Sequence, residues 1–279
     1  MCAAHRGLAK GGRWTGEVRC LPERLDEPLR WRKPRRVAMG LMGDLFHEAV
    51  PDGVIDRVWV TMALAPAHTF LILTKRPERL RRYLTDPGLY RRVLREADRI
   101  RSIHPQLGDI GISNPATSPL RWVHLGTSAE DQATLVERLP YLLATPAAVR
   151  FLSLEPLLAP VRLPLGWREV PPGTVGIDWL ICGGEAGPGA RPCEVGWIRS
   201  VVEQCRDARV PCWVKQLGAR PVVADADFGN LGPYTRCAED GSNEVRFYHH
   251  SGADPSEWPE DLRVREVPAG QGMQSQEPK

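Results

Sequence analysis

Six short apolar runs of the sequence are each followed by charged or hydrogen-bonding groups. Acids, bases and glycines that converge in one place are what an enzyme needs to bind and orient a small molecule. The candidates for contacting and transforming a substrate are Asp44, Lys75, Glu155 and Lys215. The simpler alternative is that strand ends become polar wherever the chain reaches water. We favour a binding site because such groups follow all six runs.

Two of the basic side chains have more than one interpretation. Lys75 and Arg76 can hold a carboxylate or phosphate of a ligand, or they can pair with Glu155 or Glu185 within the protein. His47, after the first run, is either part of the site or an ordinary surface residue. The sequence leaves these alternatives open.

A glycine-rich stretch, GGEAGPGAR, follows the fifth run. Glycines let a backbone approach a ligand closely and present N–H groups to anions. The stretch lacks the Lys-Ser/Thr pair of a P-loop, so it does not predict nucleoside triphosphate hydrolysis. The candidates for cofactor binding are Gly183, Gly184, Glu185, Gly187 and Arg191. The alternative is a tight strand-to-helix turn without a ligand.

The seven cysteines do not have the spacing of a metal site or a disulfide framework. They stand at positions 2, 20, 182, 193, 205, 212 and 237, and no C-x-x-C pair occurs. The odd count and wide spacing argue against structural zinc, iron–sulfur and disulfide patterns, so we predict no metal ligands. Cys182, Cys205 and Cys212 lie in apolar surroundings and are predicted to be reduced core residues.

Strands and helices must position these groups. The apolar runs are Val37–Leu41, Thr69–Thr74, Trp122–Gly126, Val149–Ser153, Trp179–Cys182 and Cys212–Val214. They are continuous rather than alternating, as in parallel strands buried on both faces. Apolar residues recur at helical spacing between them, for example at Ile198, Val201 and Cys205. Further helices are predicted around Val54–Met62, Leu80, Arg91–Arg101 and Leu135–Leu143, the last with a kink or restart at Pro140.

This alternation predicts an α/β fold with a parallel sheet. A (β/α) barrel or partial barrel fits better than a dinucleotide-binding sheet, because no G-x-G-x-x-G opens a helix after the first run. We expect a barrel domain over residues 1–218, a C-terminal extension or lid over 219–267, and a disordered tail over 268–279.

Composition is that of an ordinary globular protein, with 42% hydrophobic and 25% charged residues and a net charge of +3. No apolar run approaches the roughly 18–20 residues of a membrane span, and the first residues lack the apolar core of a signal peptide. We therefore expect a cytoplasmic protein without a membrane partner. The basic stretches Arg30–Arg36 and Arg76–Arg82 either contact nucleic-acid phosphates or form a solvated helix face.

A family resemblance extends from about Arg13 to Val267. It is carried, in order, by RWTGEV, PERLDEPLRWRKPRRV, MGDLFHEAVPDGVIDRV, HTFLILTKRPERL, WVHLGTSAEDQ, RFLSLEPLL, IDWLICGGEAGPGARP and VPCWVKQLG. These strings resemble a phage-associated protein family of unknown function, whose members look like radical S-adenosylmethionine enzymes. The resemblance implies a parallel barrel in which three cysteines near the N-terminus hold a [4Fe–4S] cluster. One iron of that cluster stays open for the methionine end of S-adenosylmethionine.

This chain departs from the family at that cysteine segment. Cys2 and Cys20 are too far apart to replace it, so we expect the chain to lack the segment, through a late start codon or a decayed gene copy. We expect it to bind no cofactor as written, whereas full-length relatives would bind S-adenosylmethionine and the cluster. The first hypothesis is therefore a radical S-adenosylmethionine-type enzyme of phage or prophage origin, with unknown substrate and inactive in this form. The alternative is a non-catalytic, phage-derived protein that contacts nucleic acid through its basic stretches.

Overall fold

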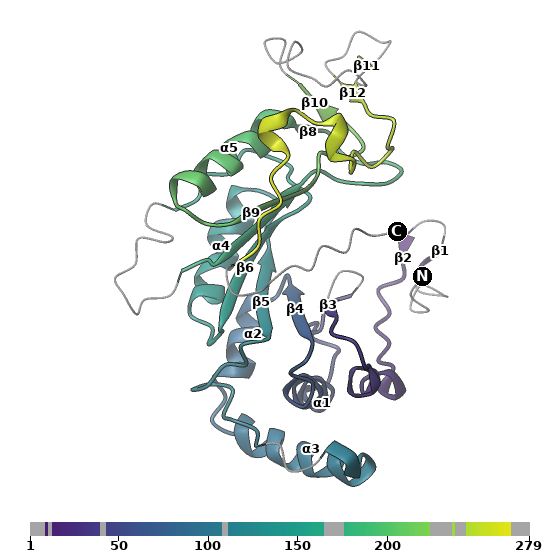
Figure 1. Ribbon diagram of the computed structural model, residues 1–279, viewed down its shortest axis with the longest axis vertical. Coiled ribbons are helices and arrows are strands. Elements are labelled where there is room, and N and C mark those ends of the chain that lie inside the picture. Colours follow the sequence, from purple (N-terminus) through teal and green to yellow (C-terminus); the bar gives the residue numbers. More distant parts are fainter. Residues whose placement is uncertain are drawn as a thin grey trace. The chain divides into compact units, whose positions relative to one another are not determined.

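The computed structural model describes residues 9–10, 13–39, 43–107, 111–164, 176–223, 236–237 and 244–268 of the 279 (Figure 1). The chain divides into two compact units, which we treat separately. Unit 1 comprises Met1–His124 and Thr145–Ala148, and unit 2 comprises Leu125–Ala144 and Val149–Lys279.

The central element is a six-stranded sheet with the strand order β3-β4-β5-β6-β7-β9. Its strands are β3 (Arg36–Met39), β4 (Thr69–Thr74), β5 (Val123–Ser128), β6 (Val149–Leu154), β7 (Trp179–Gly183) and β9 (Cys212–Gln216). The pairs β3–β4, β6–β7 and β7–β9 are parallel, and helices follow the strands as in half of a (β/α) barrel. The predicted α/β class and partial barrel are confirmed, and each predicted run forms a strand whose described ends differ by at most two residues.

Burial along the strands follows their place in the sheet. Every residue of the central β5 is buried, including the polar residues His124, Thr127 and Ser128. The edge strand β3 alternates exposed and half-buried side chains. Leu41, which we included in the first run, lies outside the described residues.

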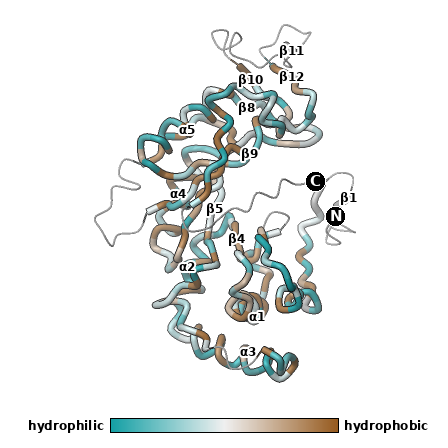
Figure 2. The backbone as a smooth tube through the Cα atoms, in the orientation of Figure 1, coloured by the Kyte–Doolittle hydropathy of each residue, from teal (hydrophilic) through white to brown (hydrophobic). Residues whose placement is uncertain are grey.

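Three helices belong to unit 1: α1 (Asp52–Ala63), α2 (Pro77–Leu84) and α3 (Leu89–Ile103). The side chains that α3 buries recur every three or four residues and pack on α1. Figure 2 shows the difference in character: α1 is mostly hydrophobic, whereas α3 alternates between hydrophilic and hydrophobic residues. Buried Asp56 of α1 links all three helices, because it accepts hydrogen bonds from Tyr83 of α2 (2.8 Å) and Arg92 of α3 (3.0 Å).

The segment before β3 is held by a second buried acid. Between the short 3-10 turns η2 (Pro22–Arg24) and η3 (Glu27–Arg30), Asp26 accepts two hydrogen bonds from Arg57 of α1, at 2.6 and 3.1 Å. His104, at the end of α3, lies 3.5 Å from the same carboxylate. These contacts join three parts of unit 1 that are distant in sequence.

Unit 2 contains α4 (Gln132–Leu143) and α5 (Val195–Asp207). Asp131 caps α4 by accepting a hydrogen bond from the backbone N–H of Thr134 at 2.8 Å. The helix continues through Pro140 as one element, so the predicted restart there does not occur.

The predicted core cysteines of unit 2 are confirmed: Cys182, Cys205 and Cys212 are reduced and buried. Cys182 and Cys212 lie on the paired strands β7 and β9, and Cys205 lies on α5. Contact with the Cys212 thiol, followed by burial, raises the pKa of Cys182 and of Cys205.

The last described residues pack on β9. Val214 donates its N–H to the carbonyl of Val264 (2.9 Å), and Glu266 donates to the carbonyl of Cys212 (2.8 Å). The C-terminal segment therefore lies alongside the edge of β9 (Figure 1). Trp258 is fully buried nearby in the sequence and donates its indole N–H to the carbonyl of Gly252.

The remaining short elements are β1 (Ala9–Lys10), β2 (Arg13–Trp14), β8 (Cys193–Glu194), β10 (Pro221–Val222), β11 (Arg236–Cys237), β12 (Val245–Arg246), η4 (Pro105–Leu107), η6 (Pro255–Glu257) and η7 (Glu260–Leu262). Most of the tail expected over 268–279 lies outside the described residues. None of the helices in the described ranges is long and apolar enough to cross a membrane.

Candidate functional site

Unit 2 brings the predicted residues Glu155 and Lys215 together with Gln216. Glu155 directly follows β6, and Lys215 and Gln216 end β9. The Oε1 atom of Glu155 accepts hydrogen bonds from Lys215 Nζ (2.7 Å) and Gln216 Nε2 (3.0 Å). Gln216 Nε2 also donates to the carbonyl of Gly184 (3.0 Å), so the end of β7 joins the same cluster. We call Glu155, Lys215, Gln216 and Gly184 the unit 2 cluster.

The Glu155 carboxylate retains capacity for a ligand. A carboxylate offers about four acceptor positions on two oxygens. In the described part of the chain, both hydrogen bonds to this carboxylate reach Oε1 and none reaches Oε2. Its side chain is only 17% exposed, whereas that of Lys215 is 46% exposed. A half-exposed ion pair of this kind adds little stability, about 0–1 kcal/mol, so either partner can turn to a ligand at low cost.

The first two glycines of the glycine-rich stretch have a packing reason. A Cβ atom on Gly183 would lie 2.7 Å from the carbonyl oxygen of Gln216, and one on Gly184 would lie 2.4 Å from that of Leu217. The missing side chains therefore allow β7 to approach the end of β9. This contact favours the strand-to-helix turn for Gly183 and Gly184, and their role in cofactor binding stays a prediction.

The rest of the stretch is a turn closed by an ion pair. Gly187 and Gly189 have φ angles of +101° and +76°, which favour glycine. The carboxylate of Glu185 accepts hydrogen bonds from the backbone N–H, Nε and Nη2 of Arg191, at 2.9, 2.7 and 3.0 Å. The hydrogen bond with Arg191 lowers the pKa of Glu185, which therefore stays ionised at neutral pH. A ligand at this position would have to compete with the pair.

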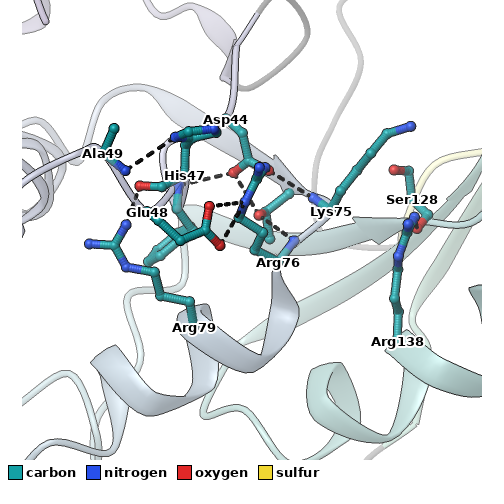
Figure 3. Close-up of polar contacts among 11 residues, drawn as sticks. Asp44, His47, Glu48, Ala49, Lys75, Arg76, Arg79, Ser128 and Arg138 are labelled. Atoms are coloured by element: carbon teal, nitrogen blue, oxygen red, sulfur yellow. Dashed lines mark hydrogen bonds and ion pairs between the residues drawn. The ribbon is translucent and has the colours of Figure 1, made fainter. Parts of the chain in front are cut away.

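In unit 1 the carboxylate of Asp44 lies at the end of β4 (Figure 3). It accepts hydrogen bonds from Thr74 Oγ1 (2.7 Å), Phe46 N (2.9 Å), Lys75 N (3.1 Å) and Arg76 Nη1 (2.9 Å). These four donors occupy the usual acceptor capacity of a carboxylate. Asp44 therefore holds its loop to β4, and the predicted contact with substrate stays untested.

The basic residues around Asp44 are also engaged. Arg76 Nε donates to Glu48 at 2.8 and 3.0 Å, and Arg79 donates to the carbonyl of Val50 (2.7 Å) and the carboxylate of Asp52 (2.8 Å). Burial works to lower the pKa of Arg76, but its hydrogen bonds with Asp44 and Glu48 outweigh burial and raise it. Arg76 thus pairs with acids of unit 1, whereas Glu155 pairs with Lys215 and Glu185 with Arg191.

Two further predicted residues in unit 1 have local contacts. His47 accepts a hydrogen bond on Nδ1 from the N–H of Ala49 (3.2 Å), which is a turn within its own loop. Lys75 supplies only its backbone N–H to Asp44, and Figure 3 shows its side chain running away from that carboxylate.

Sequence reasoning gave Gln216 no role. Its amide joins Glu155 to the carbonyl of Gly184, and its position beside Lys215 was the available signal. At the end of β5, Arg138 of α4 donates to Glu130 (3.1 Å) and to the carbonyl of Ser128 (2.8 Å). The buried hydroxyl of Ser128 has no hydrogen-bond partner among the described residues.

The described residues do not fit an iron–sulfur cluster. No group of three His, Cys, Asp or Glu side chains in the described ranges is placed to hold a metal ion. Cluster ligands are thiolates, whereas burial raises the pKa of Cys193 to about 12 and the pKa values of Cys182 and Cys205 are also raised. These three thiols keep their protons. Hydrogen bonds with Cys182 and Cys205 lower the pKa of Cys212, but one thiolate in the core does not supply the three that a cluster needs.

Comparison with known proteins gives one match. The model of a family described as "Protein of unknown function (DUF5131)" matches residues 2–260. No curated protein and no solved structure matches the chain. The match covers both units and all six strands of the central sheet.

Proposed function

We propose that this chain, which belongs to the DUF5131 family of proteins of unknown function, is the scaffold of a radical S-adenosylmethionine-type enzyme of phage or prophage origin. Its parallel half-barrel supports an enzyme that binds small molecules at the carboxyl ends of its strands. The enzyme type and the phage origin rest on the sequence resemblance. Fold alone does not identify a reaction, so the proposal is carried by the site.

The observation that carries the proposal is the unit 2 cluster. Glu155 and Lys215 place a carboxylate and an ammonium 2.7 Å apart at the ends of β6 and β9, the two strands that flank β7. The methionine end of S-adenosylmethionine carries one ammonium and one carboxylate, so each partner offers it the opposite charge. Gln216 holds the Glu155 carboxylate by donating to Oε1, so Oε2 is available to accept a hydrogen bond from a ligand. The work of these residues is binding and orientation.

The Glu185–Arg191 pair is a second acid–base pair at the strand ends of unit 2. Arg191 binds its partner through three N–H groups, so this pair has less capacity to open than Glu155 with Lys215. We therefore place the zwitterion at Glu155 and Lys215. Asp44 and Lys75 remain predicted contacts of the substrate, and Glu185 and Arg191 of the cofactor.

Calorimetric titration of the intact chain with S-adenosylmethionine tests the site. This proposal replaces the expectation that the chain binds no cofactor as written, because the unit 2 cluster can bind S-adenosylmethionine without iron. We expect saturable binding, weakened at least tenfold, or by about 1.4 kcal/mol, in a Glu155→Gln variant that loses the charge opposite the ligand ammonium. Glu137→Gln is the matched control, because exposed Glu137 of α4 makes the same charge change in unit 2. Melting curves should show all three proteins folded. The site is refuted by absent binding to the folded chain, or by equal affinity in Glu155→Gln.

Anaerobic reconstitution tests our expectation for the metal. We expect the chain, incubated with iron, sulfide and reductant, to retain no stoichiometric four-iron cluster after desalting. The reason is that Cys182, Cys193 and Cys205 are buried with raised pKa values and the sequence has no closely spaced trio. Iron counting and the visible spectrum measure this. Four irons per chain with the matching absorption would show the expectation to be wrong.

A further inference from the structure

Charge is divided unequally between the two units. Unit 1 contains 22 Lys and Arg against 13 Asp and Glu, a formal charge of +9, whereas unit 2 contains 15 against 21, a charge of −6. The total of +3 conceals this division. A strongly basic unit in a chain whose other unit is acidic points to a polyanionic partner for the basic unit.

Half of the eight arginines of α2 and α3 have acidic partners. Arg79 pairs with Asp52, Arg92 with Asp56 and Asp86, Arg99 with Glu96, and Arg101 with Asp98. The exposed arginines that form no ion pair in the described part of the two helices are Arg81, Arg82, Arg91 and Arg95. We call these four the basic surface. Intramolecular pairing accounts for the first group and leaves the basic surface for another partner.

The placement of Arg91 and Arg95 on α3 is not explained by folding. They lie one helical turn apart, on the side opposite the buried residues Leu89, Val93 and Ala97. Like charges at this i, i+4 spacing destabilise a helix by about 0.2–0.5 kcal/mol. The nearest acids on the helix, Glu96 and Asp98, pair with other arginines. A ligand with repeated negative charge would neutralise both arginines and so relieve the repulsion between Arg91 and Arg95 when it binds.

An aromatic ring accompanies the arginines. Tyr90 precedes Arg91 on α3 and is 37% exposed, and Leu94 one turn later is 36% exposed. Arginines that follow a phosphate backbone, together with an exposed aromatic ring on which a base can stack, are typical of surfaces that bind single-stranded nucleic acid. We infer that Arg91, Arg95 and Tyr90 on the exposed side of α3 form a binding site for single-stranded nucleic acid, which Arg81 and Arg82 of the preceding helix extend along the chain. This inference is independent of the proposed enzymatic activity.

The inferred site differs from the stretch Arg76–Arg82 that the sequence offered as a contact of nucleic-acid phosphates. Within Arg76–Arg82, Arg76 and Arg79 are engaged in ion pairs, and only Arg81 and Arg82 belong to the basic surface. The other two arginines come from α3, for which the sequence predicted a helix around Arg91–Arg101 but no nucleic-acid contact.

Fluorescence anisotropy with the intact chain and a labelled single-stranded oligonucleotide tests the inference. Four phosphate contacts predict that log K falls with log[salt] with a slope of about −3, because each contact on a single strand contributes about −0.7. In an Arg91→Gln, Arg95→Gln double variant we expect affinity to fall at least tenfold and the slope to fall to about −1.4. Tyr90→Leu should weaken binding at least fivefold, because base stacking is lost.

The matched control is Arg162→Gln with Arg206→Gln, two exposed arginines of unit 2 whose removal changes the net charge equally. We expect this control to bind like the wild type. The double variant on α3 should melt no lower than the wild type, because like-charge repulsion is removed. Duplex DNA and vesicles with anionic headgroups are the competing ligands. The inference is overturned if either binds as tightly as the single strand, if the control weakens binding equally, or if Tyr90→Leu has no effect.

Discussion

Replacing Gly184 with alanine will destabilise the protein by about 3 kcal/mol or more, before any ligand is considered. The added Cβ would lie 2.4 Å from the carbonyl oxygen of Leu217 and 2.9 Å from Cα of Gly218. Backbone atoms cannot rotate away as a flexible side chain can, so β7 and the end of β9 must separate. Overpacking in a rigid contact typically costs about 1–3 kcal/mol, and a clash with backbone lies at the upper end.

Urea denaturation followed by circular dichroism measures this loss. Gly196→Ala is the matched control, because Gly196 lies in α5 of the same unit with nothing within 4 Å of an added Cβ. We expect the control to be unchanged or more stable by about 0.5–1 kcal/mol, since alanine is the better helix former. A Gly184→Ala protein as stable as the wild type would contradict the packing role of Gly184 and favour its predicted role in cofactor binding.

Asp26→Asn will cost unit 1 about 2–3 kcal/mol at neutral pH. The variant leaves the guanidinium of Arg57, only 16% exposed, opposite a neutral amide in place of a carboxylate held at 2.6 Å. Breaking one partner of a largely buried pair costs more than the pair contributed, because the other charge stays desolvated. Asp98→Asn is the control: its carboxylate is 79% exposed beside Arg101, so we expect a change below about 0.5 kcal/mol.

The same residue gives a pH dependence of known sign. Burial works to raise the pKa of Asp26, but hydrogen bonds and charge from Arg57, and then His104, outweigh burial and lower it. A lowered folded-state pKa stabilises the protein above the unfolded value, near 3.8, and this contribution is lost as pH falls through the folded value. Below about pH 4 the difference between wild type and Asp26→Asn should therefore shrink. A constant difference from pH 7 to pH 3 would contradict the assignment.

The strands and helices were predictable because their signals are local. Continuous apolar runs such as Thr69–Thr74 mark buried parallel strands, and this strand begins and ends where predicted. Strand ends were less predictable: β5 continues through Thr127 and Ser128, and β9 through Lys215 and Gln216. Backbone hydrogen bonds continue past the point where side chains become polar, so polarity alone shortens the prediction.

The partners of the site residues could not be predicted, because they come from distant parts of the chain. Arg76 has Asp44 and Glu48 as partners rather than Glu155 or Glu185, and no sequence signal separates these acids. The role of Gly184 depends on Leu217, which only the pairing of β7 with β9 brings near. The sequence does not distinguish a glycine that makes room for a ligand from one that makes room for a neighbouring segment of the backbone.

The three residues Val264–Glu266 protect the sheet from self-association. An uncovered edge strand presents unpaired N–H and C=O groups, which can recruit a strand from another molecule and begin aggregation. On β9 the N–H of Val214 and the carbonyl of Cys212 are instead bonded to Val264 and Glu266. The polypeptide therefore occupies, with its own backbone, hydrogen-bonding positions that a second molecule would need to add a strand beside β9.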